Sequence, residues 1–258
     1  TIKAFMTSTS VDVAILGFYQ IVEDKDGNIV KEGEIFPQKN YISNSVEETV
    51  RNVLPKYLGY SVDDILEWVN STEAISKRLE WGAVWRNVYR RDFLNKNQIR
   101  FNPSIRLNED SMFNAMCFSR AQKIRTLNKG FYCYTIRPSG AFMKKRDAEL
   151  VGNKMALLEA RSNIVNDLNK RGFNFSVKDY AGSNVMSCFE LIIKMPFSAR
   201  SETKKYIRNL LVKESIKILP FTGRKKVDIP LLALKCNLQA LMIYAVNLGK
   251  LFGVQFQL

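Results

Sequence analysis

The hydrophobic pattern of this chain changes near residue 139, and the change predicts two regions of different architecture. Before it, runs rich in β-branched and aromatic residues at 11–22 and 29–36 predict two strands joined by an Asp-Gly hairpin turn. Beyond it, apolar residues recur every three or four positions, as they do on one face of a helix. We therefore expect an α/β region over residues 1–142 and an all-helical region over residues 143–258.

Further elements of the α/β region follow from the same patterns. Residues 45–79 have helical spacing, and so do residues 108–120, where the leading Asn is a favourable N-cap. Short strands are expected at 85–91, 123–127 and 131–137, the last two around an Asn-Lys-Gly turn. The expected fold class is α/β, a sheet with flanking helices followed by the helical region.

The helical region divides into segments with recognisable ends. One apolar face runs over residues 151–168 and stops at the Lys-Arg-Gly of 170–172, where cations followed by Gly indicate a helix end. Residues 184–194 and 201–215 predict two more helices. Residues 230–252 predict a last helix that is opened by its proline and is apolar nearly all round.

The residue types limit the chemistry that this chain can perform. It contains no histidine, which excludes Ser-His-Asp and Cys-His triads and HExxH zinc sites. Its four cysteines are far apart and form no CxxC pair, so neither a zinc site nor a disulfide framework is indicated. Buried free thiols in a reducing cytoplasm are the expected state. Any reaction must then use carboxylates, amines, hydroxyls or a metal held by oxygen.

The charge of the chain is unevenly distributed. Residues 1–80 hold 8 basic and 13 acidic side chains, a balance of −5, whereas residues 81–258 hold 31 and 12, a balance of +19. Such polarity indicates a basic surface that faces an anion. A nucleotide diphosphate, a phospholipid headgroup, an anionic glycan and a nucleic acid all fit this requirement.

Four segments follow one another in a distinctive order. An aromatic-basic stretch at 85–94 precedes a short connector at 99–101, an acidic pair that opens a helix at 107–113, and a Tyr-rich strand that ends in Arg at 131–137. Over about residues 10–142 this order resembles the acceptor-side half of family-2 glycosyltransferases with the GT-A fold. These enzymes transfer a sugar from a nucleotide diphosphate to a hydroxyl of an acceptor.

The resemblance implies further properties of the protein. The nucleotide-binding half of the family has no counterpart in the pattern, so the isolated chain is expected to be inactive or nearly so. A divalent cation, Mg²⁺ or Mn²⁺, is implied beside the leaving diphosphate, with ligands mostly outside this chain. The implied setting is bacterial polysaccharide biosynthesis in the cytoplasm, with a glycan or lipid-linked acceptor and contact with the inner face of the membrane as a further expectation.

The acidic pair Glu109 and Asp110 is the leading candidate for catalysis. Helical spacing places Asp110 on the same face as Phe113 and Cys117, so its carboxylate should lie at the edge of an inward-facing apolar surface. The resemblance implies that Asp110 is the general base and Glu109 a supporting or acceptor-binding residue. Acids in a first helical turn also stabilise the helix without any other role, and that alternative stays open.

Two more residues are candidates for substrate binding. Trp85 opens the segment that resembles the Trp-containing strand of the family, and it fits either a sugar platform or core packing. The resemblance implies that Arg137 lies near the leaving diphosphate, where a guanidinium would stabilise negative charge. Asp24 and Asp26 have DxD spacing but occupy a polar hairpin turn, so they are not expected to bind a metal.

Alternatives to an enzyme remain at this stage. The basic surface also fits a non-catalytic interaction module that binds nucleic acid or an anionic membrane, although no nucleic-acid-binding signature is present and that partner is not favoured. Lys235, Asn237 and Gln239 interrupt the last helix, which makes it a poor membrane span. It fits either a helix buried in its own domain or a helix lying on a bilayer beside the cations of residues 224–226.

Overall fold

The computed structural model describes residues 5–7, 10–138 and 149–251. The chain forms two compact units, one made of residues 1–57 and 79–145, the other of 58–78 and 146–258. The boundary expected at residues 142–143 lies outside the described residues. The structure also groups residues 58–78 with the second unit, which the sequence pattern did not indicate.

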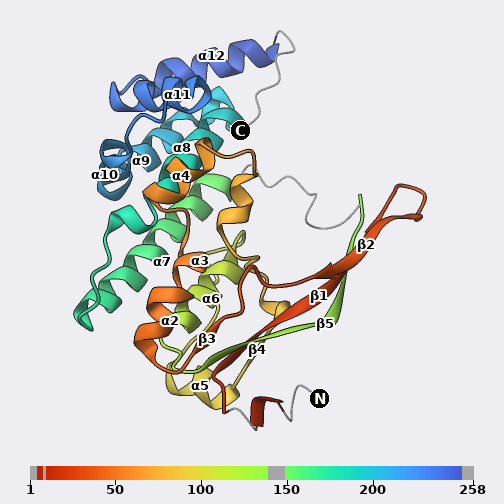
Figure 1. Ribbon diagram of the computed structural model, residues 1–258. Helices are drawn as coiled ribbons and strands as arrows, with labels where there is room; N and C mark the ends of the chain where they lie inside the picture. The colour runs from red at the N-terminus through yellow and green to blue at the C-terminus, as the bar shows by residue number, and fades with distance from the viewer. Residues whose placement is uncertain (1–4, 8–9, 139–148, 252–258) are drawn as a thin grey trace. The chain divides into compact units, whose positions relative to one another are not determined.

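The first unit is built on a mixed sheet centred on β1 (Figure 1). β1 is parallel to β5 on one edge, and on its other edge it is antiparallel to β4 and then to β2. β3 pairs with the outer edge of β5. The strands are β1 (Val13–Glu23), β2 (Ile29–Ile35), β3 (Ile42–Ser43), β4 (Asn87–Tyr89) and β5 (Ile124–Ile136). The hairpin of β1 and β2 confirms the predicted strands and their Asp-Gly turn, in which Gly27 has a φ of 84°.

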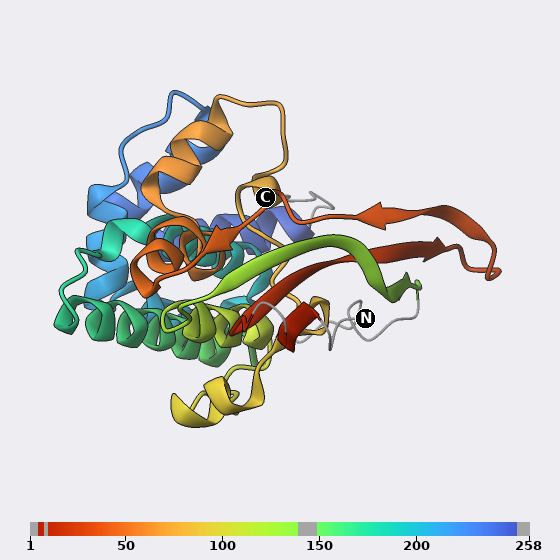
Figure 2. The same ribbon diagram turned by 60° about the horizontal axis from the view of Figure 1, so that its bottom comes forward.

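The two short strands expected after residue 122 are one long strand. Leu16 pairs with Leu127 and Gly17 pairs with Gly130, so two residues intervene on β5 where none intervenes on β1. The expected Asn-Lys-Gly turn is therefore a bulge, because pairing with β1 continues on both sides of it. Figure 2 shows β5 and β1 as long curved strands that run side by side.

The strand expected over residues 85–91 is present only in part. Val84–Arg86 forms the 3-10 turn η2, β4 covers Asn87–Tyr89, and helix α5 begins at Arg91. The turn directs the Arg86 side chain inward, where its Nε–H donates to the Leu16 carbonyl at 3.2 Å. Buried polar contacts thus override the strand preference of this aromatic-basic stretch.

Helices pack at the end of the sheet where β3 and β4 lie, whereas β2 is exposed or partly exposed along its whole length (Figure 1). The Tyr57 ring of α3 and the Phe118 ring of α6 pack against each other, with their centroids 4.5 Å apart. Near β3, α2 and α6 lie beside each other (Figure 1). The helices are α2 (Val46–Asn52), α3 (Pro55–Leu58), α5 (Arg91–Lys96) and α6 (Glu109–Phe118).

The second unit is helical, as expected, and helix α8 is at its centre. α8 contacts α4, α7, α9, α10 and α12. Gly182 of α8 permits the contact with α4, because an added Cβ would lie 2.6 Å from Ile65 and from the Ser61 carbonyl. The α-helices are α4 (Val62–Val69), α7 (Leu150–Lys170), α8 (Ala181–Lys194), α9 (Arg200–Ile207), α10 (Leu210–Ile218), α11 (Lys225–Lys235) and α12 (Gln239–Leu251). The short 3-10 segments are η1 (Ile75–Arg78), η5 (Val177–Asp179) and η6 (Phe197–Ala199).

Two predicted helices of this unit are each divided. The helix expected over residues 201–215 breaks before α10, where the Asn209 carboxamide oxygen accepts the Leu211 N–H at 3.0 Å and caps a new helix. The last helix does not begin at Pro230, which lies inside α11. Asn237, at a φ of 58°, separates α11 from α12, and the expected end at residue 252 lies outside the described residues. None of the described helices combines the length and apolar character needed to cross a membrane.

The four cysteines are free, but only two of them are buried. Cys117 and Cys188 lie in the cores of the two units, where burial raises the pKa of each thiol well above its ordinary value. Cys133 and Cys236 are exposed, so the expectation of four buried thiols is wrong for these two.

Candidate active site

The acidic pair opens helix α6, as predicted. Glu109 and Asp110 occupy its first turn, and both are partly buried. Phe113 and Cys117, on the same face as Asp110, are buried, so the predicted orientation of this face is confirmed. The N-cap prediction is wrong in one respect: Asn108 has a φ of 65°, in the left-handed region, and its side chain makes no capping hydrogen bond.

The Asp110 carboxylate has one fixed oxygen. Its Oδ2 accepts the Val84 backbone N–H at 3.2 Å, and its Oδ1 accepts no hydrogen bond from the described residues. Desolvation by burial raises the pKa of Asp110 above its ordinary value, and the Val84 N–H opposes this only in part. The result is a carboxylate held in place by one oxygen, with a raised proton affinity and a second oxygen that accepts no hydrogen bond from the described residues.

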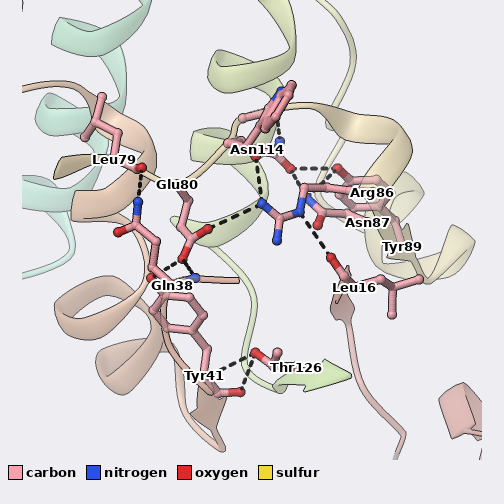
Figure 3. A network of polar contacts seen from close by, with 12 residues as sticks. Leu16, Gln38, Tyr41, Leu79, Glu80, Arg86, Asn87, Tyr89, Asn114 and Thr126 are labelled. Atoms are coloured by element: carbon pink, nitrogen blue, oxygen red, sulfur yellow. Dashed lines mark hydrogen bonds and ion pairs between the residues drawn. The ribbon is translucent and has the colours of Figure 1, made fainter. Parts of the chain in front are cut away.

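Asn114 fixes the segment that carries the Val84 N–H. Its Nδ2 donates to the Gly82 carbonyl at 2.7 Å, and its Oδ1 accepts from the Asn87 amide at 2.8 Å and from the Tyr89 hydroxyl at 2.6 Å. Figure 3 shows Asn114 between these groups, beside Arg86. Because Asn114 lies one helical turn after Asp110, it holds α6 against the same segment that the carboxylate contacts.

A buried ion pair between Glu80 and Arg86 holds the two ends of the segment that contains Gly82 and Val84. The Arg86 Nη1 lies 3.4 Å from a Glu80 carboxylate oxygen, and both side chains are 1% exposed. The other Glu80 oxygen accepts the Tyr41 hydroxyl at 2.9 Å and the Gln38 backbone N–H at 2.7 Å (Figure 3). These contacts connect residues 80–86 to β1 through Arg86 and to the chain before α2 through Glu80.

An aromatic cluster lies next to this segment. Trp85 stacks on Tyr132 at 4.5 Å and on Tyr134 at 4.8 Å, with interplanar angles of 25° and 17°. Phe18 meets the edges of both Trp85 and Trp81, at 5.0 and 4.9 Å. Trp85 is thus engaged in packing, whereas Trp81, at 39% exposed, and Tyr132 are the more accessible members. Since Val84 and Trp85 are adjacent, the cluster begins next to the hydrogen bond of Asp110.

Arg137 is not in contact with this site. It follows the end of β5, and its Nε donates to a Glu23 carboxylate oxygen at 2.8 Å, which raises the pKa of Arg137. Alternation along β5 places Tyr132 and Tyr134 on one face and Cys133 on the other, and Arg137 continues the Cys133 series. A role for Arg137 at the leaving diphosphate therefore stays a prediction, as does the role of Glu109.

The DxD sequence forms a turn, as predicted. Asp24 accepts hydrogen bonds from the Asp26 and Asn28 backbone N–H groups, each at 2.9 Å, which lowers the pKa of Asp24. Among the described residues, no cluster of three or more His, Cys, Asp or Glu side chains could hold a metal ion.

The sequence did not reveal the residues that hold Asp110 in place. Glu80, Arg86 and Asn114 are buried polar residues, a class that periodicity cannot separate from exposed ones. The accessibility of Trp81 relative to Trp85 was equally unpredictable, because both lie in one short segment. One signal was present: the alternation of Tyr132 and Tyr134 on a strand predicts two aromatic rings on a single face.

Comparisons with known proteins connect the chain to glycosyltransferases. No protein-family model matches it. It is 38% identical over 56 residues to the uncharacterized glycosyltransferase EpsJ of Bacillus subtilis (strain 168), over 22% of this chain and 16% of EpsJ. The crystal structure of S. aureus TarS 1–349 in complex with UDP-GlcNAc aligns with 99% of this chain and 64% of its own, at 15% identity and a TM-score of 0.41. The chain spans less than two thirds of either protein. The EpsJ match confirms the expected relationship to glycosyltransferases.

Proposed function

We propose that the chain is the acceptor-side part of a glycosyltransferase that moves a sugar from a nucleotide diphosphate to a hydroxyl group. The observation that carries this proposal is the Asp110 carboxylate, which has one fixed oxygen, a second oxygen without a described hydrogen-bond donor, and a pKa raised by burial. The relationship to EpsJ over 56 residues supports the class of reaction.

In the proposed reaction, Asp110 acts as general base. The acceptor hydroxyl donates to Oδ1 at hydrogen-bond distance and loses its proton to that oxygen as the hydroxyl oxygen attacks the anomeric carbon. A new carbon–oxygen bond forms there, and the bond to the diphosphate breaks, with its electron pair leaving on the nucleoside diphosphate. Direct displacement inverts the anomeric configuration. The Val84 N–H fixes the direction in which the carboxylate accepts the proton.

The acceptor in this proposal is a glycan or a lipid-linked glycan that packs on the aromatic cluster. A sugar ring presents C–H groups that pack on an aromatic face. Trp81 and Tyr132 offer exposed aromatic surface, and Trp85 holds the cluster together through its stacking on Tyr132 and Tyr134. The platform role predicted for Trp85 is therefore proposed to be shared with Trp81. Glu109, next to the base, is proposed to position the acceptor.

On the donor side of the reaction, Arg137 is the one residue of this chain to which a role is proposed. A nucleotide sugar is the proposed donor, and Arg137 is proposed to move from Glu23 to the leaving diphosphate. The implied divalent cation would neutralise that diphosphate, but the described residues offer no cluster to hold one. The steps assigned to Asp110 do not depend on a cation. The isolated 258-residue chain is proposed to show little or no transfer.

Turnover by the natural protein that contains this sequence tests the proposal. Nucleoside diphosphate release is measured with a panel of nucleotide sugars and glycan acceptors, and donor affinity is measured separately. Asp110→Asn is expected to lower kcat by more than about 100-fold, because the proton acceptor is lost, with donor affinity unchanged. Asp92→Asn is the matched control, because Asp92 is an exposed acid in the first turn of α5.

Three outcomes would count against parts of the proposal. Full turnover by Asp110→Asn would remove the base assignment, and transfer by the isolated chain would contradict its proposed inactivity. If no nucleotide sugar is consumed, and the protein instead binds DNA or RNA with a steep salt dependence, the non-catalytic basic module is correct.

A further inference from the structure

Helix α12 presents an apolar face to solvent. Its outward positions recur at helical spacing and include Leu241, Tyr244, Leu248 and Leu251, all exposed, with Leu241 at 62% and Leu251 at 83%. The opposite side of the helix is buried in the second unit, through Ile243 among others. The sequence allowed a helix buried in its own domain, but only one side of α12 is buried. An ordinary surface helix places polar residues on its outward face, and α12 does not.

A cation lies at the rim of this face. The Tyr244 ring meets the Phe197 ring edge to face at 6.0 Å, and the Arg200 guanidinium lies 4.5 Å from the centre of the Phe197 ring. Phe197 is itself exposed, so the apolar surface of α12 continues onto η6 and ends at a positive charge. This order of apolar surface followed by cation is the one that side chains adopt at a membrane interface.

The surrounding chain is strongly basic. Residues 191–258 hold twelve Lys and Arg against three Asp and Glu, a balance of +9. One of the three acids, Asp228, accepts hydrogen bonds from the Thr222 and Gly223 backbone N–H groups, each at 2.8 Å. Three exposed cations, Arg224, Lys225 and Lys226, stand at the start of α11. The helix with the exposed apolar face thus belongs to a strongly basic stretch of the sequence.

We propose that the outward face of α12 binds the interface of an anionic lipid bilayer, with the helix lying parallel to the surface. Leu241, Leu248 and Leu251 would enter the boundary between headgroups and acyl chains, while Arg200 and the cations of α11 meet lipid phosphates. The proposal is independent of sugar transfer, since it rests on residues of the second unit alone.

The charge and the length of the helix argue against other occupants. A second copy seated on this face would bring two regions of +9 together, and their repulsion opposes such a dimer. The 13 described residues of α12 rise about 20 Å, less than the roughly 30 Å hydrocarbon core, which favours a helix that lies on the surface. An anionic lipid surface accommodates both the exposed apolar side chains of α12 and the positive charge of residues 191–258.

Vesicle binding by the full chain tests the proposal. Cosedimentation is measured with vesicles of phosphatidylcholine alone and of phosphatidylcholine containing phosphatidylglycerol. We expect binding to the anionic vesicles, and a loss of about tenfold or more in the double variant Leu241→Ser/Leu248→Ser. Leu210→Ser is the matched control, because Leu210 is an 81% exposed leucine on a different helix, α10. Circular dichroism shows whether each variant is folded.

A charge variant separates the contribution of the cations to membrane binding from that of the apolar side chains. Arg200→Glu is expected to weaken binding to anionic vesicles by about fivefold or more, because each cation near such a surface contributes about that factor. Lys213→Glu, on α10, controls for the change in net charge. Failure to bind anionic vesicles, equal binding to neutral ones, or an equal loss in Leu210→Ser would each overturn the proposal. So would self-association that the double leucine variant abolishes, since the face would then join copies of the chain.

Discussion

The Glu80 carboxylate and the Arg86 guanidinium lie 3.4 Å apart in the first unit, and neither side chain reaches solvent. Each is also bound to another part of the chain: Glu80 accepts from the Tyr41 hydroxyl, and Arg86 donates to the Leu16 carbonyl. The five residues between them include Trp81, Gly82 and Val84, which belong to the candidate site. The ion pair therefore helps to fix the position of the Val84 N–H, which donates to the Asp110 carboxylate.

Removing one member of this pair should destabilise the protein strongly. Arg86→Met leaves the Glu80 carboxylate buried without its cation, and the expected loss in the free energy of unfolding is about 3–5 kcal/mol. Urea denaturation of the full chain measures it. Arg51→Met is the control, because Arg51 pairs with Glu47 at 2.8 Å on the surface, where an ion pair contributes at most about 1 kcal/mol. Similar losses in the two variants would contradict the supporting role of the buried pair.

The raised pKa of Asp110 predicts the acid side of the pH–rate profile. Below its pKa the carboxyl is protonated and cannot accept a proton from the acceptor, so kcat/KM should fall as pH drops through that value. Because burial raises the pKa, the fall should begin at a higher pH than an ordinary aspartate with a pKa of about 3.9 would give. In Asp110→Asn, the residual activity should lack this limb. An unchanged limb in that variant would assign it to another group.

The same shift has a consequence for stability. A carboxyl whose pKa is raised by folding contributes stability below its unfolded pKa, and this contribution is lost as pH rises through the folded pKa. Ionised Asp110 is therefore slightly unfavourable to the fold at neutral pH. Asp110→Asn should not lower the thermal midpoint at pH 7, although it removes activity. A clear drop in the midpoint would show that the first-turn charge chiefly stabilises α6.

Local patterns predicted most of the elements of this protein. The β1–β2 hairpin, the start of α6 at its acidic pair, and the end of α7 before Gly172 follow from residues within a few positions of each feature. The orientation of Asp110 followed in the same way, from its spacing to Phe113 and Cys117. These features depend on turn chemistry and on helical periodicity, both of which are encoded in neighbouring residues.

Long-range contacts determined what the sequence pattern missed. Residues 58–78 join the second unit because the Tyr60 N–H donates to the Ser183 hydroxyl at 2.7 Å and Arg161 Nε donates to the Leu58 carbonyl at 2.7 Å. The partners are more than a hundred residues apart in the sequence. The bulge in β5 depends likewise on its register with β1, which no pattern within residues 123–137 specifies.

The two tryptophans beside the site should respond differently to truncation. Trp85→Ala removes the ring that stacks on Tyr132 and Tyr134, and a loss of about 3 kcal/mol in the free energy of unfolding is expected. Trp81→Ala should cost less stability, because Trp81 is partly exposed, and should raise the KM for the acceptor. Trp81→Phe should restore that KM. If Trp81→Ala changes stability but not KM, the acceptor does not pack on this cluster.

Gly82 provides the sharpest structural test of the site. A Cβ at this position would lie 3.0 Å from the Ser111 Cβ and 3.1 Å from its Cα, so Gly82→Ala must displace the start of α6 from the segment that it contacts. Because Asp110 precedes Ser111, the displacement should weaken its hydrogen bond to Val84 and lower kcat, and a small misplacement of a catalytic group can cost about 100-fold. Ser111→Gly removes the nearest atoms, so the double variant should regain part of the lost turnover, beyond what the two single changes predict by addition. Additive losses in turnover would mean that the fit of Gly82 against Ser111 does not position the carboxylate.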